Sequence, residues 1–225
     1  MATDIIVSYD GTANDHDALA LGRLLAGAGG SLGLAYVRHT RESEHRQEEL
    51  AQHDAEALLA EGAKWLDRPG VPRHVVLSGS TPEGLRELAE REQAKVIVFG
   101  SEYRTAPGHV DPQNSARRLL DGGPLAVAIA PAGLHERGIE RIETIAAVPG
   151  ELDAAATETA EWLGTTLGAT LLARPRAPVS LLVVGSKRGT PSGRVTISAA
   201  AEYLIETGTS SVLVVPRGTA IRLGS

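Results

Sequence analysis

The sequence contains no cysteine, a single phenylalanine and no long apolar run. Without cysteine the chain forms no disulfide, has no thiolate nucleophile and holds no zinc or iron–sulfur centre through sulfur. Aromatic residues make up 3% of the chain, too few for a surface that stacks single-stranded nucleic acid. The formal net charge of −6 also argues against binding to a phosphate backbone, which is held chiefly by lysine and arginine. We therefore expect no nucleic-acid partner.

The sequence also lacks the features of a membrane protein. No apolar stretch approaches the roughly 20 residues that cross a bilayer. The chain opens on the strand-like pattern MATDIIVSYD, instead of a basic stretch followed by an apolar signal core. We therefore expect no membrane contact and a cytoplasmic location. With 225 residues, 42% of them apolar, the chain is long enough for one or two domains with buried cores.

Two parts of the chain repeat each other. Residues 96–133 align without a gap on residues 181–218, at an offset of 85, and share loop glycines, a serine after the strand and a late proline. Residues 4–11 align on residues 143–150 at an offset of 139, so the second copy is shorter by 54 residues. Chance similarity between two strand-loop-helix units is the alternative, but agreement at the loop glycines favours a true repeat.

The repeat predicts two domains, a complete one at residues 1–132 and a truncated one at residues 138–225. In the first, five short apolar runs are typical of strands: residues 5–10, 31–39, 73–78, 95–99 and 125–131. Four helical segments alternate with them: residues 14–27, 42–66, 81–93 and 115–120, with Thr81 expected to cap the third. This alternation indicates an α/β fold with a doubly wound, Rossmann-like parallel sheet of five strands, followed by an abbreviated second copy.

In such a sheet a ligand binds outside the carboxyl ends of the strands. Asp10 ends the first strand, and residues 100–115 form a loop that leads into a helix whose free N–H groups favour an anion. Gly100 would let the backbone approach that anion closely. Because strand-ending aspartates are also common helix caps, and loop glycines also serve turns, this pattern alone leaves a purely structural interpretation open.

The combination of VSYDG near the N-terminus with FGS, PGHV, PQNSARRLL and LAVAIAP resembles the universal stress protein family, and its tandem form in particular. The resemblance covers residues 2–132 as a complete unit and about 138–218 as an abbreviated one. It implies a sheet order of 3-2-1-4-5 and an adenine-nucleotide (ATP) site. In that site Asp10 and Val37 would border the adenine, and Gly100 would begin the phosphate loop. The implied site residues are Ser8, Asp10, Val37, Phe99, Gly100, Tyr103, Gln113, Asn114 and Ser115.

The phosphate loop departs from the family pattern of G-x-x-G, nine residues, then glycine and a serine, threonine or asparagine. Tyr103 and Gln113 stand where the second and third glycines would fall. Their side chains would fill the phosphate approach, and a buried amide without a partner is costly. We therefore expect ATP binding to be weak or absent. Asn114 would either cap the helix or touch a ribose or phosphate, and a plain N-cap together with Ser115 is an equally good interpretation.

No pattern in the chain indicates catalysis. It contains no G-x-x-x-x-G-K-[ST], no G-x-S-x-G and no H-E-x-x-H, and its seven histidines show no metal-ligand clustering. We therefore expect a stress-response regulatory protein that is not an enzyme and has no catalytic residues and no bound metal. The alternative is a protein-interaction or dimerisation scaffold that has lost nucleotide binding.

Two expectations concern packing. The closing strands at residues 125–131 and 211–217 are edge strands in the family order, so we expect them to face each other across a pseudo-two-fold axis. The 54 absent residues would include two helices that cover one sheet face. Either Leu171, Leu181 and Val183, or their neighbours of opposite parity such as Leu182 and Val184, would then face water, and the tail from residue 219 looks too short and polar to cover them. We expect a homodimer contact or a protein partner on that face, or helices of the first domain reaching across.

Overall fold

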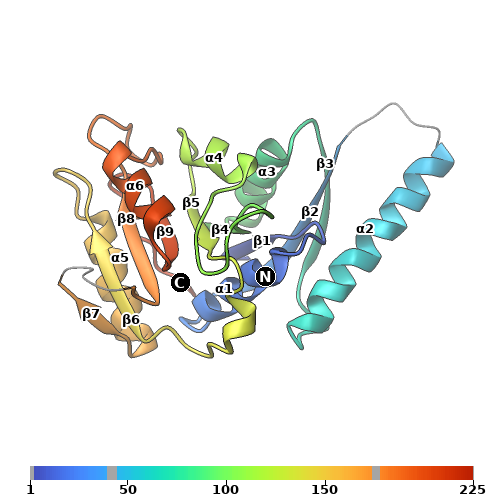
Figure 1. Ribbon diagram of the computed structural model, residues 1–225. Helices are drawn as coiled ribbons and strands as arrows, with labels where there is room; N and C mark the ends of the chain where they lie inside the picture. The colour runs from blue at the N-terminus through green and yellow to red at the C-terminus, as the bar shows by residue number, and fades with distance from the viewer. Residues whose placement is uncertain (1–2, 40–44, 174–177, 225) are drawn as a thin grey trace.

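The computed structural model describes residues 3–39, 45–173 and 178–224, with the backbone alone for residues 45–51. This part of the chain forms one sheet of nine strands, in the order β3-β2-β1-β4-β5-β9-β8-β6-β7. Helices cover both faces of the sheet, and α2 packs beside β2 and β3 at one end of it (Figure 1). None of the described helices is long and apolar enough to cross a bilayer.

The described residues of the first half form five strands and four helices. The strands are β1 (Ile5–Ser8), β2 (Leu32–His39), β3 (Arg73–Ser78), β4 (Val96–Gly100) and β5 (Ala126–Ala130). The helices are α1 (Asp15–Ala26), α2 (His45–Trp65), α3 (Thr81–Glu92) and α4 (Asn114–Leu120). All neighbouring pairs among these strands are parallel, and the order 3-2-1-4-5 is confirmed. Residues 42–44 of the predicted second helix lie outside the described residues.

The expected cap of α3 is wrong by one residue. Ser80, not Thr81, has the extended backbone of an N-cap, and its hydroxyl oxygen accepts the N–H of Glu83 at 3.4 Å. Thr81 is already the first helical residue, with Pro82 behind it in the first turn. Proline is tolerated there because the first N–H groups of a helix have no intrahelical partner.

In the second half, the part of the chain that the structure describes forms four strands, two α-helices and a short 3-10 helix. These are η1 (His135–Arg137), β6 (Thr144–Val148), α5 (Ala155–Leu167), β7 (Thr170–Leu172), β8 (Leu181–Gly185), α6 (Ala199–Thr207) and β9 (Ser211–Val215). The strands β7, β6, β8 and β9 are parallel to one another. β5 and β9 pair antiparallel, with Val127 opposite Val214 and Ile129 opposite Val212, which confirms that the two closing strands meet. The two halves thus share one continuous sheet.

Two hydrophobic cores lie on opposite faces of this sheet. On one face the strands pack against α1, α2 and α5, and on the other against α3, α4 and α6. Successive residues of a strand point to opposite faces, so a strand that is covered on both sides is apolar throughout. The run Val96–Phe99 is an example, because all four of its side chains are buried.

The expected bare sheet face in the second half is wrong. Leu181 and Val183 are fully buried within the single chain, and Leu182 and Val184 are also buried, whereas Leu171 on the edge strand β7 is 45% exposed. α5 covers the face of the first pair, and α6 packs in the core on the face of the second pair. This face therefore does not require a partner or a second copy to cover it.

The C-terminal tail, expected to be too short and polar, contributes to this cover. Ile221 and Leu223 are buried in the core that contains α5, while Arg222 between them is exposed. The Ile221 N–H donates to the Thr159 hydroxyl at 2.9 Å, and the Lys95 ammonium donates to the Arg222 carbonyl at 2.7 Å. Two alternating apolar side chains are enough for the tail to bury one side, because an extended segment presents every second residue to the same side.

The segment that joins the two halves is fixed to α1 by a buried carboxylate. Asp17 is fully buried, and its two oxygens accept the N–H groups of Gly133 and His135, each at 2.8 Å. The His135 ring nitrogen Nδ1 also lies 2.5 Å from the same carboxylate. Because a buried carboxylate requires such partners, these contacts hold the linker in place.

Candidate functional site

The candidate site lies at the carboxyl ends of β1 and β4, where the winding of the sheet reverses. These two strands are paired, with Val7 opposite Val98, so the loop after β1 and the loop after β4 leave the sheet side by side. Ser8 ends β1, Asp10 follows it on the surface, and Gly100 ends β4. The structure thus brings these three predicted site residues to one rim.

The loop after β1 is organised by Asp15, the first residue of α1. One carboxylate oxygen of Asp15 accepts the N–H groups of Asp10, Gly11 and Thr12, at 2.6, 2.8 and 3.1 Å. The Thr12 hydroxyl donates to the other oxygen at 3.0 Å. Asp15 is 3% exposed, whereas Asp10 is exposed and accepts only the Thr12 N–H, at 3.2 Å, among the bonds described. Asp15 therefore shapes the loop, and the Asp10 carboxylate stays open at the rim.

The charge of this loop depends on pH near neutrality. Burial, followed by repulsion from the Asp10 carboxylate, raises the pKa of Asp15 from 3.8 to about 7. The hydrogen bonds from the Asp10 N–H and the Thr12 hydroxyl oppose this shift but do not cancel it. Burial also raises the pKa of the neighbouring Tyr9, together with the negative charge of Asp15. Below neutral pH the rim therefore carries one negative charge fewer.

The loop after β4 is held by side chains of the protein itself. The Asn14 amide donates to the carbonyls of Ser101 and Glu102, at 3.0 and 2.8 Å. The Gln113 amide donates to the Ser101 carbonyl at 3.4 Å. A Cβ atom on Gly100 would lie 2.1 Å from the Asn14 carbonyl oxygen, so only glycine fits there. Gly100 thus serves a close approach, as predicted, but what approaches it is the start of α1.

A buried hydroxyl fixes the start of this loop, and the second half repeats the arrangement. The Ser101 hydroxyl donates to the Ala130 carbonyl at 2.7 Å and accepts the Asp111 N–H at 3.2 Å. The Ser186 hydroxyl makes the same two contacts at positions 85 residues later: it donates to the Val215 carbonyl at 2.9 Å and accepts the Thr196 N–H at 3.3 Å. Both serines are fully buried.

Two predicted site residues have side chains in the core. Val37 and Phe99 are buried in the core that contains α3 and α4. Val37 packs closely under α3, because a Cβ on Gly84 would lie 2.9 Å from its side chain. Only the backbone of these two residues is left to reach a ligand at the rim.

The Tyr103 side chain is 60% exposed, and the guanidinium of Arg104 lies over its ring, 4.9 Å from the centroid. A cation on the face of an exposed aromatic ring is a favourable contact. The expectation that Tyr103 fills the phosphate approach stays a prediction. Of the two departures from the family pattern, Gln113 makes a hydrogen bond to the loop backbone.

The expected N-cap at Asn114 is wrong, whereas the other interpretation, a contact of Asn114 with a ribose or phosphate, stays a prediction. α4 begins at Asn114, which is exposed, with Ser115 in its first turn, and no side-chain hydrogen bond caps the helix. Gln113 occupies the N-cap position, but its amide turns to the Ser101 carbonyl. The expected cost of an amide without a partner is therefore also wrong, because Gln113 has one.

Sequence analysis missed Asn14, Asp15 and Ser101. Ser101 and Ser186 align in the repeat, so the signal for a shared role was present. Asn14 and Asp15 stand at the start of a predicted helix, where such residues are common caps. The contact of Asn14 with Ser101 crosses 87 residues of sequence and could not be read from local pattern, whereas the contacts of Asp15 are with residues 10–12 nearby. Among the described residues, no three histidine, aspartate or glutamate side chains are grouped to hold a metal ion.

Comparisons with known proteins agree with this fold. The model of the Universal stress protein family matches residues 1–131. A universal stress protein from Archaeoglobus fulgidus DSM 4304 is 13% identical and aligns over 97% of this chain and 100% of that chain, with a TM-score of 0.69. A putative universal stress protein from Pseudomonas aeruginosa UCBPP-PA14 is 16% identical over 96% of this chain and 94% of that chain, with a TM-score of 0.58.

A universal stress protein in complex with cAMP is 19% identical over 44% of this chain and 76% of that chain, but its TM-score of 0.37 is too low to carry an argument about ligands. No curated protein matches the chain. At these identities the solved structures show the shared fold alone. The family model covers more than half of the 225 residues. The chain therefore belongs to the universal stress protein family.

Proposed function

We propose that the protein is a stress-response regulator whose first half keeps a degenerate adenine-nucleotide site that binds ATP weakly. One observation carries this proposal: the amide of Gln113 lies at the start of α4 and donates to the Ser101 carbonyl. A phosphate that approached the N-terminus of α4 would have to displace this side chain. Breaking such a hydrogen bond costs about 1 kcal/mol, and the displaced amide then competes with the phosphate for space.

The loop after β1 supports the same proposal. The N–H groups of residues 10–12 all point at the Asp15 carboxylate, so they are not free to donate to a ligand. Asp10 remains exposed and is the carboxylate that the resemblance assigns to the adenine. A site that keeps one adenine contact and loses its phosphate donors would bind the nucleotide loosely and hydrolyse nothing. We accordingly propose that the protein is not an enzyme.

We further propose that the second half is an abbreviated copy of the first. The equivalent hydrogen bonds of Ser101 and Ser186 support this proposal. So do two close backbone contacts after the strands: Gly100 with Asn14 in the first half, and Gly185 with Gly150 in the second. The proposed boundaries are residues 1–132 and 138–225, and the proposed compartment is the cytoplasm. In this copy Pro149 replaces Asp10, so the nucleotide is assigned to the first half only.

The second candidate function is a scaffold without nucleotide binding. The side chains of Asn14, Asp15 and Gln113 favour this alternative, because each is hydrogen-bonded to a backbone group of the rim that a ligand would use. A homodimer or a protein partner belongs to this alternative. Its contact surface would not be the buried sheet face of the second half.

Equilibrium dialysis with radiolabelled ATP tests the proposal. We expect the purified chain to bind ATP with a dissociation constant weaker than about 100 μM, and Asp10→Ala to weaken this binding further. Glu158→Gln, an exposed change on α5, is the control for general charge effects. Micromolar or tighter binding would contradict the degenerate site. Complete absence of binding at millimolar ATP would select the scaffold.

A further inference from the structure

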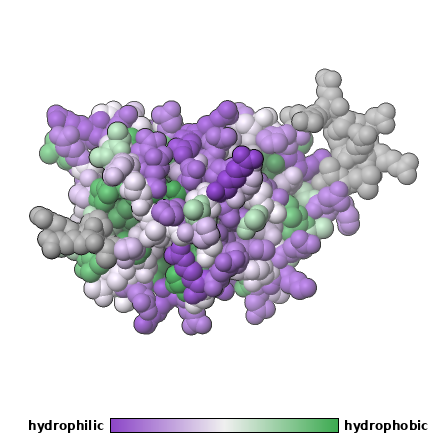
Figure 2. Space-filling model, in the orientation of Figure 1, coloured by the Kyte–Doolittle hydropathy of each residue, from purple (hydrophilic) through white to green (hydrophobic). Residues whose placement is uncertain are grey.

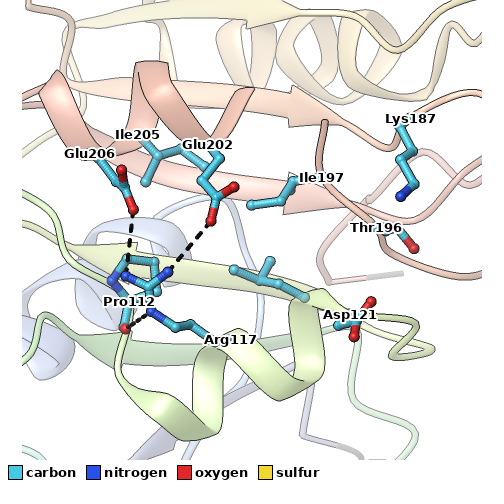
Figure 3. A pocket seen from close by; sticks show the side chains of 10 residues that line it. Pro112, Arg117, Asp121, Lys187, Thr196, Ile197, Glu202, Ile205 and Glu206 are labelled. Carbon is cyan, nitrogen blue, oxygen red and sulfur yellow. Dashed lines mark hydrogen bonds and ion pairs between the residues drawn. The ribbon is translucent and has the colours of Figure 1, made fainter. Parts of the chain in front are cut away.

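A pocket lies outside the nucleotide rim, where α4 and α6 come together beside the β5–β9 junction (Figure 3). Its volume is about 290 Å³, and residues of both halves line it. Leu120 from α4, and Ile197 and Ile205 from the second half, give it an apolar lining. The pocket exists only because the two halves pair, so it is absent from either half alone. On the face shown in Figure 2 hydrophilic residues predominate, with hydrophobic residues exposed in several places.

One end of the pocket carries excess negative charge. The Arg117 guanidinium donates to the Asp111 carboxylate at 2.6 Å and to the Pro112 carbonyl at 2.9 Å. Glu202 and Glu206, one turn apart on α6, point at the same guanidinium, each 3.6 Å from one of its nitrogens (Figure 3). Three carboxylates thus surround one cation, and this end of the pocket has a net charge of about −2 at neutral pH.

The two glutamates are only loosely satisfied by Arg117. A separation of 3.6 Å is longer than a hydrogen bond, so the attraction is electrostatic and the carboxylate oxygens keep free lone pairs. Both side chains are about half exposed, which leaves them accessible from the pocket. A ligand ammonium could therefore donate hydrogen bonds to these carboxylates without breaking the short bond between Arg117 and Asp111.

The other end of the pocket is close to neutral. Lys187, Thr196 and Asp121 lie there, away from the two glutamates (Figure 3). The lysine and aspartate charges offset each other, so this end supplies no net attraction for an anion or a second cation. The pocket therefore combines an apolar lining with a single charged end.

We propose that this pocket binds a small organic cation with an apolar body, such as an alkylammonium or arylammonium compound. The charged group would lie between Glu202 and Glu206, and the hydrocarbon would lie against Leu120 and Ile197. Removal of the hydrocarbon from water favours binding, and the ammonium adds charge-assisted hydrogen bonds. Because the site spans both halves, its ligand stabilises the junction between them. The inference is independent of ATP binding.

Isothermal titration calorimetry on the full chain tests this with three probes that share one hydrocarbon body: hexylammonium, hexanoate and hexanol. We expect binding of hexylammonium alone, together with a rise in melting temperature that grows with its concentration. The pair Glu202→Gln and Glu206→Gln should weaken hexylammonium binding by about tenfold or more. The matched control pair, Glu158→Gln and Glu161→Gln on the exposed side of α5, should leave it unchanged.

A second variant tests the pocket itself without changing charge. Ile197→Trp fills the recess from its half-buried lining and should abolish binding, while circular dichroism shows that the fold is kept. Three results would each overturn the proposal. They are binding of hexanoate as tight as that of hexylammonium, a loss of hexylammonium binding in the control pair equal to that in the Glu202 and Glu206 pair, and unchanged binding in Ile197→Trp. So would 6-aminohexanoate that binds tenfold more tightly than hexylammonium, because Lys187 would then select a zwitterion. Failure of hexylammonium to bind at millimolar concentration would also overturn it.

Discussion

Replacing Asp15 by asparagine should change how the stability of the protein depends on pH. The folded state holds the pKa of Asp15 at about 7, against an ordinary value of 3.8, so the ionised carboxylate is disfavoured in the fold. Between these two values the folded chain binds one proton more than the unfolded chain. The stability contributed by protonated Asp15 is therefore fully present below pH 3.8 and is lost as pH rises through about 7.

The size of the effect follows from the difference between the two pKa values. A pKa difference of one corresponds to 1.36 kcal/mol, so the whole range corresponds to about 4 kcal/mol. Asparagine has the same shape, keeps one oxygen to accept the three N–H groups of residues 10–12, and cannot ionise. We expect the free energy of unfolding of the variant, relative to that of the wild type, to rise by up to about 4 kcal/mol between pH 4 and pH 8.

Urea denaturation, followed by tryptophan fluorescence at several pH values from 4 to 8.5, measures this difference. The difference between the unfolding free energies of the variant and the wild type at each pH cancels the titration of all other groups that the two proteins share. Asp54→Asn, at an exposed position of α2, is the control and should run parallel to the wild type. Parallel curves for Asp15→Asn and the wild type across this range would refute the assignment of the titration to Asp15.

Three further changes test the packing. Gly100→Ala should lower the free energy of unfolding by more than about 2 kcal/mol, because its Cβ would clash with a backbone carbonyl, whereas Gly70→Ala, with open space around it, should change stability little. Ser101→Ala and Ser186→Ala should each lower the free energy of unfolding by about 1–3 kcal/mol, and by similar amounts, since both leave equivalent buried groups unpaired. A loss of stability at only one of the two positions would contradict their equivalence. Leu223→Asp should lower the melting temperature without changing the mass in light scattering, and a change of oligomeric state would contradict the intrachain role of the tail.

The sequence predicted the fold well because its strands are apolar throughout and its helices have regular spacing. The strand order came from the family resemblance, and the meeting of β5 and β9 followed from their position at the edges of that order. The cover of the second half could not be predicted in the same way. The two helices that the second half lacks correspond to α2 and α3, which pack on opposite faces of the sheet, so their absence does not strip a single face, and α5 and α6 cover the two faces. Ile221 and Leu223 of the tail add to the core beside α5, and a pattern of two residues is too short to distinguish from a polar tail.

The candidate site was predicted only in outline. Asp10 and Gly100 lie at the rim as expected, because strand ends and loop glycines are visible in the sequence. The groups that satisfy the loops are long-range partners: Asn14 reaches Ser101 across 87 residues. Such contacts depend on which strands are neighbours and on how closely their loops pass. Gln113 illustrates the limit, since its position was noticed but its partner was not.

Titration of the Gln113→Gly variant with ATP in a calorimeter tests the central claim most directly. The change restores a glycine at the start of α4 and removes the amide that donates to the Ser101 carbonyl. Ser198→Gly, the change at the equivalent position of the second half, is the matched control and should leave ATP binding unaltered. We predict that Gln113→Gly tightens ATP binding by about tenfold, or 1.4 kcal/mol, relative to the wild type. Unchanged affinity in Gln113→Gly, or an equal gain in Ser198→Gly, would contradict the account.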